Sequence, residues 1–458
     1  MHTEHSGLPP RLPGSLPLVG HLPGLLRDPL HFLRSARPAG PLVALKLGMR
    51  TAYLVNDHDL LHQVLVTDAD SYIRGKHFQK ARTVAGAGII TTSGPEHKRQ
   101  RALMLPAFSR ASICGYAESM TSAIEASMSA WPDTTSVDAR KRFLSLTTTV
   151  ASRALFGTQL PASGVALVEE ALPVLTREVN LRVLDPTGFL EKLPTPGNRR
   201  FRDVMTRLDA LIMDLVDRRR SDPPAQEDLL SVLVRGYDPH TGRALTDQEV
   251  RDEVISILLS STETTSLTLS WACYELARHP GLQEEVWREI DAVLPPGPIG
   301  HEVLKGLEFT QKVVKETLRL YPPTYFLSRE AAHDVDLGGH RLPAGSTLLY
   351  SIYAQHRDER LFPSAEVFDP HRWDPSRSAG IPLSAYVPFG EGAHRCIGEG
   401  FATAEATTAL AVLLRSRTLR LAPGAEVQEV GTVTLSPRGL HLVAGRRARS
   451  TASGSGML

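Results

Sequence analysis

Cys396 stands in a glycine-rich segment that runs directly into a strongly helical one. Gly390 and Gly392 precede it and Gly398 follows it, which favours a tightly turned loop. A helix N-terminus offers free backbone N–H groups and the positive end of the helix dipole, and both lower the pKa of a nearby thiol. Three interpretations follow for this residue: an inert cysteine, a reactive nucleophile or a metal-bound thiolate.

The residues around Cys396 narrow this choice. Residues 389–398 resemble the haem-binding signature of cytochromes P450, F-G-x-G-x-H-x-C-x-G, and agree with it at Phe389, Gly390, Gly392, His394, Cys396 and Gly398. The resemblance implies that Cys396 is the axial ligand of haem b (iron protoporphyrin IX), and that His394 contacts a haem propionate. It also assigns Phe389, Gly390 and Gly398 to the cofactor-binding loop.

A long helix is predicted after Thr246. Thr246 and Glu249 form a capping box, and apolar residues follow on nearly every face. We expect this helix to end near His279, to run for roughly 30 residues and to cross the core.

The middle of this helix carries the second chemical pattern. Residues 260–265 resemble the family's [AG]-G-x-[DE]-T-[TS] stretch, which implies that Glu263 and Thr264 are the acid–alcohol pair that guides protons to dioxygen. The alternative is a packing and capping role, although a buried glutamate without a partner is costly. Ser260 and Ser261 depart from the family's small residue and glycine. We expect serine to loosen this turn by bonding to the carbonyl four residues back.

A third pattern is structural. Glu316 and Arg319 are three residues apart in a helical segment predicted from Phe309 to Leu320, where alone they would form an ordinary ion pair. Further along, Arg372 lies in a segment that resembles the family's P-x-R-[FW] element. The resemblance implies that it joins the pair in a buried network behind the haem, with no catalytic role.

A basic segment precedes all of these. His97 and Arg101 are four residues apart, so they share one helix face and are predicted to grip one carboxylate. By the same resemblance they bind a haem propionate, and Arg329 provides a further contact. A solvated basic helix face is the other interpretation, and it suits Lys98 and Arg99.

The resemblance also places the substrate pocket, whose residues are mostly apolar and without clustered charge. We therefore expect a hydrophobic, weakly polar substrate. A terpenoid of actinobacterial secondary metabolism is the first hypothesis, and a macrolide, steroid or fatty acid the alternative. The expected pocket residues are Val84, Ile89, Ile257, Ser260, Ser261, Thr324, Tyr325, Phe326, Leu327 and Val433.

The elements that position these residues suggest one large fold. The class expected is mainly α with small β-sheets (α+β), the cytochrome P450 fold with a long central helix over the haem, as a single domain over residues 1–458. Residues 1–40 form a proline-rich segment whose part from 8 to 24 should lie extended. The runs 42–47 and 52–55 predict a β-hairpin. Residues 446–458 are predicted to be a disordered tail.

The composition excludes several classes of protein. Fifty-one Lys and Arg balance 50 Asp and Glu, which argues against nucleic acid or an anionic membrane as the main partner. Three cysteines argue against a disulfide framework and favour a reducing compartment. Without a signal peptide or an apolar stretch of membrane-spanning length, a cytoplasmic monomer is expected.

The resemblance implies a haem-thiolate monooxygenase that uses O₂ to hydroxylate or epoxidise its substrate. Only Cys396 resembles a metal ligand, so electrons are expected from a separate ferredoxin and ferredoxin reductase, which Arg395, Lys98 and Arg99 would help to dock. Other classes are a peroxygenase of the same fold, a non-catalytic haem-binding or sensor protein, and a haem-free protein. The Glu263–Thr264 pair argues against the first two.

Overall fold

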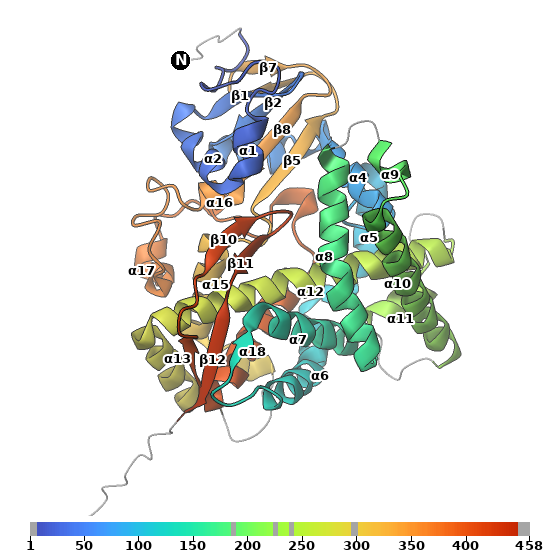
Figure 1. The fold of residues 1–458 in the computed structure, drawn as a ribbon, viewed down its shortest axis with the longest axis vertical. Helices are drawn as coiled ribbons and strands as arrows, with labels where there is room; N and C mark the ends of the chain where they lie inside the picture. Colours follow the sequence, from blue (N-terminus) through green and yellow to red (C-terminus); the bar gives the residue numbers. More distant parts are fainter. Residues whose placement is uncertain (1–6, 185–188, 223–227, 238–241, 295–300, 448–458) are drawn as a thin grey trace, which may run out of the picture.

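The computed structural model describes residues 7–184, 189–222, 228–237, 242–294 and 301–447. Helices dominate it, and the sheets are small and separate, so the α+β class expected from the sequence is confirmed (Figure 1). The predicted tail falls outside the described residues from position 448 onward. Among the described residues, no helix is both long and apolar enough to cross a membrane.

The helices gather below the largest sheet in Figure 1. The α-helices are α1 (Leu22–Arg27), α2 (Pro29–Ser35), α3 (His58–His62), α4 (Lys76–Ala85), α5 (Gly94–Met104), α6 (Arg110–Ser129), α7 (Ala139–Ala154), α8 (Ala162–Leu184), α9 (Phe189–Lys192), α10 (Pro196–Ser221), α11 (Leu229–Arg235), α12 (Asp247–Arg278), α13 (Pro280–Val293), α14 (His301–Leu304), α15 (Glu308–Leu320), α16 (Ile352–Gln355), α17 (Pro375–Ser378) and α18 (Glu399–Ser416).

The strands form four sheets within the described ranges. In the largest sheet the order is β1-β2-β8-β5-β3, with β2 parallel to β8 and the other neighbours antiparallel; β4, β12 and β9 form another, and β6–β7 and β10–β11 are hairpins. The strands are β1 (Leu42–Leu47), β2 (Arg50–Val55), β3 (Tyr72–Arg74), β4 (Ser136–Asp138), β5 (Phe326–Ala331), β6 (Val335–Leu337), β7 (His340–Leu342), β8 (Thr347–Ser351), β9 (Arg417–Leu421), β10 (Gln428–Gly431), β11 (Leu435–Arg438) and β12 (His441–Arg446). The predicted hairpin is β1–β2 and is confirmed.

In the proline-rich segment residues 8–16 are mostly extended, and single bridges join Arg11 to Ala44 and Gly20 to Leu47 of β1. The prediction of an extended chain up to residue 24 was wrong for its last part, because residues 17–19 form a turn and α1 begins at Leu22. Pro23 lies in the first turn of α1, where a proline removes no helical hydrogen bond.

Helix α12 is the central element of the core, as predicted. Thr246 and Glu249 form the capping box, and the helix of 32 residues stops where His279 caps it before Pro280. It packs against α7, α15 and α18. Near its C-terminal end, Trp271 stacks on Tyr321 after α15, with ring centroids 4.1 Å apart. Its packing against α18 places α12 beside the helix that follows the Cys396 loop.

Candidate functional site

Cys396 lies two residues before Gly398, the N-cap of α18, as expected from the glycine pattern. Its backbone N–H donates to the carbonyl of Phe389 at 2.8 Å, which closes the loop. Gly392 has φ 67°, and a Cβ there would stand 1.9 Å from the carbonyl oxygen of Leu65, so only glycine fits. The loop therefore has one shape, and it holds the sulfur at the start of the helix.

Some neighbours of Cys396 raise the pKa of its thiol and others lower it. Cys396 keeps accessible surface, yet the protein around it is dense enough that desolvation raises the pKa of its thiol. The backbone N–H of Gly398 and the cations Arg101 and Arg395 oppose this rise by favouring the thiolate. The chain thus partly neutralises the negative charge of a thiolate at this position, and a bound metal cation would complete the neutralisation.

Imidazole and guanidinium groups gather beside this loop. The rings of His97 and His394 are 4.1 Å apart between centroids. Burial and, after it, the charges of nearby arginines, Arg74 and Arg329 among them, together lower the pKa of His97 to about 4 and that of His394 to about 2. His394 also has a buried Nδ1 without a hydrogen-bond partner.

The charges and hydrogen-bond donors of this cluster show whether the site suits haem. A concentration of cationic and imidazole groups, with an unsatisfied buried nitrogen among them, calls for an anion with acceptor oxygens. Haem b presents two propionate carboxylates to a protein, together with an iron that a cysteine thiolate can ligate. The residues present therefore fit the cofactor, and His97, His394 and Arg329 would hold its propionates.

Arg101 bonds to the backbone of the cysteine loop. Its Nη1 donates to the backbone carbonyl of Arg395 at 2.6 Å, so it ties α5 to the cysteine loop. Burial lowers the pKa of Arg101, and Cys396 opposes that shift. A shared grip of His97 and Arg101 on one carboxylate stays a prediction.

The acid–alcohol pair lies at the middle of α12. The Thr264 hydroxyl donates to the Ser260 carbonyl at 2.6 Å. Ser260 itself donates to the Ser256 carbonyl four residues back, which confirms the bond expected there, whereas Ser261 bonds to Leu258 only three residues back. Both serines use their hydroxyls on the helix backbone.

Glu263 turns away from this ladder toward the C-terminal segment. Its Oε1 accepts a hydrogen bond from the Thr434 hydroxyl at 3.1 Å. Burial raises the pKa of Glu263, while Thr434 and then Arg140 act against the rise. A carboxyl that is easily protonated, next to Thr264 on the same helix, is suited to hold a proton and release it.

Two further residues were missed by sequence reasoning. Glu405 on α18 is fully buried, and burial raises its pKa well above the usual value, with Thr265 of α12 opposing the shift. A glutamate at a core position of a helix would have been the signal. Arg74 was missed as well, and no local sequence pattern marks it.

The expected pocket residues occupy different environments. Val84, Ile89, Ile257 and Tyr325 are buried, whereas Val433 is 39% exposed. The remainder are partly buried, namely Ser260, Ser261, Thr324, Phe326 and Leu327. Two open hollows of about 720 and 560 Å³ lie beside the N-terminal segment and include none of these residues.

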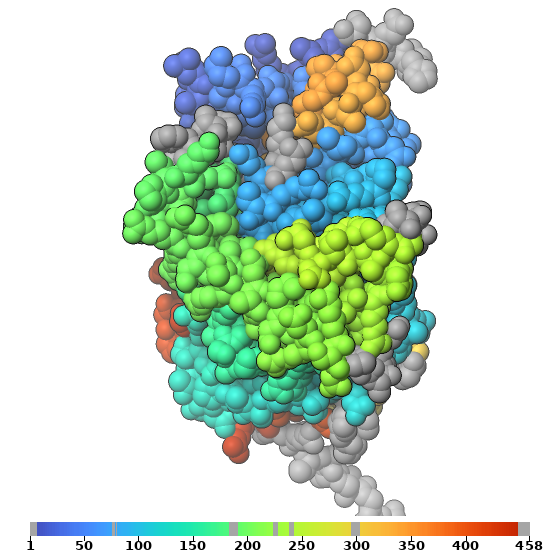
Figure 2. All heavy atoms as spheres, turned by 90° about the vertical axis from the view of Figure 1, so that its right-hand side faces the viewer, coloured from blue at the N-terminus to red at the C-terminus, as the bar shows by residue number. Residues whose placement is uncertain are grey.

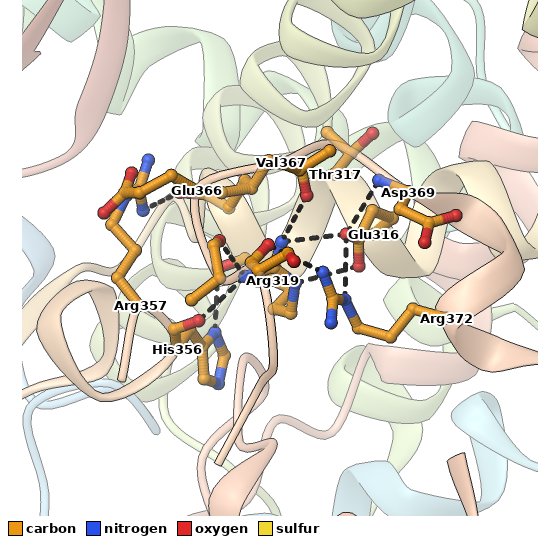
Figure 3. A network of polar contacts seen from close by, with 12 residues as sticks. Glu316, Thr317, Arg319, His356, Arg357, Glu366, Val367, Asp369 and Arg372 are labelled. Carbon is orange, nitrogen blue, oxygen red and sulfur yellow. Dashed lines mark hydrogen bonds and ion pairs between the residues drawn. The ribbon is translucent and has the colours of Figure 1, made fainter. Parts of the chain in front are cut away.

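A closed network of hydrogen bonds joins Glu316, Arg319 and Arg372 (Figure 3). Arg319 makes two hydrogen bonds of 2.9 and 2.8 Å with the carboxylate of Glu316, and Arg372 adds a third at 3.3 Å. Trp373 and the backbone of Asp369 donate to the same carboxylate, both at 3.0 Å. Arg319 uses its other donors on the carbonyls of His356, Ala365 and Val367. Glu316 and Arg319 have no exposed surface, so the solvent does not reach their bonds, and a purely structural role for the network stays a prediction.

The basic residues expected to meet a ferredoxin have acidic neighbours. Arg395 pairs with Glu399 at 2.6 Å, and Lys98 with Asp70 at 3.2 Å. Arg99 contacts Glu249 at 3.5 Å. Local pairing reduces the positive potential that each side chain offers, and docking through them stays a prediction.

Comparison with known proteins gives the following likenesses. The family model described as cytochrome P450 matches residues 10–440. The chain is 39% identical to cyclooctatin synthase of Streptomyces melanosporofaciens over 94% of each chain. It is 36% identical to pentalenene oxygenase of Streptomyces avermitilis, over 96% of this chain and 98% of that one. Cyclooctat-9-en-7-ol 5-monooxygenase of Streptomyces melanosporofaciens is 36% identical over 90% of each.

Proposed function

The chain belongs to the cytochrome P450 family, and on that basis we propose that it inserts one oxygen atom from O₂ into a hydrophobic terpenoid of secondary metabolism. Membership makes it a haem b-dependent oxidoreductase and monooxygenase. The observation that carries the substrate class is the set of relatives. At 36–39% identity over 90% or more of their length, they are named for cyclooctatin, pentalenene and cyclooctat-9-en-7-ol.

Each part of the site has a proposed role. Haem supplies the activation of dioxygen, and the chain supplies a ligand, an orientation and protons. Cys396 would ligate the haem iron as a thiolate, and its loop includes Phe389, Gly390 and Gly398. The residues proposed to orient the cofactor through its propionates are His97, Arg101, Arg329 and His394.

Glu263 and Thr264 are proposed to hold and move protons at the middle of α12. The Glu263 carboxyl holds a proton readily because burial raises its pKa, and the Thr434 hydroxyl orients it. The Thr264 hydroxyl donates to the Ser260 carbonyl in the structure, and in the proposed relay it leaves that carbonyl by rotating about χ1, donates its proton and accepts another on its oxygen.

Substrate class is tested by titrating the ferric holoenzyme and following its spin state. Polycyclic terpene hydrocarbons and alcohols are expected to shift the Soret band of the ferric holoenzyme to the high-spin position. A macrolide aglycone, a steroid and a fatty acid of matched hydrophobicity are expected to leave the spectrum unchanged. Tighter binding by any of these three would replace the terpenoid assignment.

Thr264→Ala is expected to uncouple electron use from product formation. NADH consumption with a surrogate ferredoxin and reductase should continue, while product formed per NADH falls by about tenfold or more, since a positioned proton donor contributes at least that much. Thr264→Ser should restore most of the coupling because it keeps the hydroxyl.

Thr268→Ala is the matched control for this test. Thr268 makes the same type of bond one turn later, from its hydroxyl to the Thr264 carbonyl at 3.0 Å. Its replacement should leave coupling unchanged. Equal coupling in Thr264→Ala and Thr268→Ala would remove Thr264 from the proton relay.

Electrons are proposed to arrive from a separate ferredoxin and ferredoxin reductase. The sequence holds three cysteines, fewer than the four that an iron–sulfur cluster of the ferredoxin type requires. The family works with redox partner proteins, and the type of partner is the part still proposed. A monomeric state and a cytoplasmic location stay predictions.

A further inference from the structure

Two adjacent acids on α12 hold the segment between α4 and α5, residues 86–93. The Ala87 N–H donates to Asp252 at 2.7 Å, and the Ile89 N–H donates to Glu253 at 3.0 Å. Both acids are buried, with 5% and 3% of their surface exposed. A buried carboxyl group is costly unless hydrogen bonds offset its desolvation, and here the backbone of the segment supplies those bonds.

Two glycines of the segment allow this close contact. Gly86 has φ 62°, and a Cβ there would lie 2.0 Å from the Asp252 carboxylate. A Cβ on Gly88 would lie 2.2 Å from the Ser256 hydroxyl, which itself donates to the Ala85 carbonyl at 3.3 Å. At these positions the backbone of the segment therefore lies directly on α12.

Gln100 of α5 provides a second anchor for the segment. Its Nε2 donates to the Ala87 carbonyl at 2.6 Å, and its Oε1 accepts from the Thr92 hydroxyl at 2.5 Å. Within the segment, the Thr91 hydroxyl donates to the Gly86 carbonyl at 2.6 Å. In Figure 2 the blue surface of α4 and α5 is bordered by the green and yellow-green surface of the helices from α8 to α12. The segment is thus bonded to two helices, α5 and α12.

Asp252 also connects the segment to α10. Its Oδ1 accepts from Arg251 at 2.9 Å and from Gln248 at 2.7 Å. Arg251 in turn donates to Asp209 of α10 at 2.6 and 2.8 Å. The Ala87 N–H bonds to the other oxygen, Oδ2. Charge-assisted bonds of this kind fix the orientation of a carboxylate, so the charge of Asp252 contributes to the anchoring.

Glu253 is held by fewer bonds. Its Oε2 accepts from the Ile89 N–H, while its Oε1 is buried and has no hydrogen-bond partner among the described residues. Burial raises the pKa of Glu253 to about 8, and the bond from Ile89 opposes that rise. Near pH 7 this carboxyl group is therefore mostly protonated, and a neutral amide of the same shape should be able to replace it.

The anchored segment lies close to the proposed proton relay. Ser256, Ser260 and Thr264 follow one another at intervals of four residues, so they lie along one side of α12. Thr264 is eight residues beyond Ser256, about 12 Å along the helix axis. That distance is comparable to the length of a polycyclic terpenoid. A substrate held against Thr264 would therefore meet the segment, which includes the buried side chain of Ile89.

We propose that Asp252 and Glu253 are positioning residues that fix residues 86–93 as one wall of the substrate pocket, and that they thereby determine which ligand shapes the pocket accepts. The inference rests on the proposed monooxygenase site and names two residues for its selectivity. Neither acid touches the substrate, because each acts through a backbone N–H of the segment. A wall that is fixed before binding favours ligands of matching shape, and its release reduces that preference.

The first test measures amide hydrogen exchange of the purified holoenzymes. In Asp252→Ala the Ala87 amide loses its acceptor, and in Glu253→Ala the Ile89 amide does. Each of these amides should then exchange about tenfold faster or more, as for the loss of one hydrogen bond. Exchange at the wild-type rate in both variants would overturn the anchoring.

Glu289→Ala is the matched control for both variants. Glu289 of α13 also accepts backbone N–H groups, those of Phe309 and Thr310 at the start of α15. Its replacement removes the same type of bond from another part of the fold. It should speed exchange at the start of α15 and leave residues 86–93 as in the wild type.

The second test titrates the ferric holoenzymes with imidazole, phenylimidazole and adamantylimidazole, which shift the Soret band when they bind to haem. Imidazole needs little room, so its dissociation constant should stay as in the wild type. The dissociation constants of the two apolar imidazoles should rise about tenfold in Asp252→Ala and in Glu253→Ala. Glu289→Ala should leave all three unchanged, even where it lowers the temperature of unfolding.

The conservative variants separate the roles of the two acids. Glu253→Gln keeps a neutral acceptor and should bind the apolar imidazoles as the wild type does near pH 7. Asp252→Asn loses the charge that Arg251 holds, so it should recover only part of the affinity. If the apolar imidazoles kept their wild-type affinity in both alanine variants, or changed only in parallel with imidazole itself, the proposal would be wrong.

Failure of the proposed haem site gives a different result. In that case the wild-type protein itself would lack the thiolate-type spectrum of the reduced CO complex and would show no Soret shift with imidazole. Variants that keep both signals, yet differ in their affinity for the apolar imidazoles, report on the wall of the pocket alone.

Discussion

Cys396→Ala is expected to abolish the thiolate-type CO spectrum and all monooxygenation. The sulfur is held by a loop with one shape, closed by the bond from Cys396 N–H to the Phe389 carbonyl. Thiolate ligation favours O–O cleavage, and neither alanine nor water can replace its electron donation. The measurements are the reduced CO difference spectrum and product formation from whichever substrate the titration identifies.

The other two cysteines cannot substitute for it. Cys273 is fully buried in α12, and desolvation raises the pKa of its thiol far above the usual value. Cys114 lies on α6. Cys114→Ala is therefore the control and should keep both spectrum and activity.

Cys396→Ser separates loss of the sulfur from loss of the loop. Serine retains the size of the side chain and the N–H bond to Phe389, so the protein should fold and still lose the thiolate spectrum. A thiolate-type spectrum in either variant at this position would show that another residue ligates the iron.

Glu316→Ala is expected to cost about 3–5 kcal/mol of folding free energy, the usual consequence of breaking a buried ion pair from one side. Without the carboxylate, Arg319 and Arg372 keep their charges in a place with almost no exposure, and Trp373 loses its acceptor. The measurements are the midpoint of thermal unfolding and the yield of haem-loaded protein, both of which should fall sharply.

Two further variants serve as comparisons for Glu316→Ala. Glu316→Gln keeps the shape and one acceptor oxygen, so its loss should be smaller than that of alanine but still large. Asp214→Asn removes an exposed partner of Arg218 four residues away, a pair worth under about 1 kcal/mol. If Glu316→Ala unfolded at the same temperature as Asp214→Asn, the network would not be a main support of the fold.

The long helix could be predicted because its signals are local. The capping box at Thr246, the apolar run and the proline after His279 are all contiguous in sequence, and α12 has the predicted limits. The pairing of Glu316 with Arg319 is local too. Their junction with Arg372 came from the family resemblance, since no spacing rule connects residues that far apart.

The position of Arg74 could not be predicted from local signals. Arg74 lies opposite Arg329 only because of the register between β3 and β5, two short strands far apart in the chain. The carboxylates of Asp252 and Glu253 interrupt an apolar run within α12, and their bonds to the backbone of Ala87 and Ile89 arise only in the folded chain. The start of α1 was missed because prolines were taken to exclude a helix, although the first turn accepts them.

The hydroxyl ladder of α12 has a consequence for motion. The carbonyl that Thr264 uses, on Ser260, also accepts the helical N–H of Thr264, as any carbonyl inside a helix does. Rotating the threonine about χ1 therefore leaves no acceptor orphaned, and the hydroxyl gives up one bond while the backbone keeps its own. Thr268 and Ser270 are bonded in the same way, each to the residue four before it. The backbone of the helix can keep all its hydrogen bonds while single side chains change rotamer. A hydroxyl can therefore turn toward a new acceptor at the cost of one hydrogen bond.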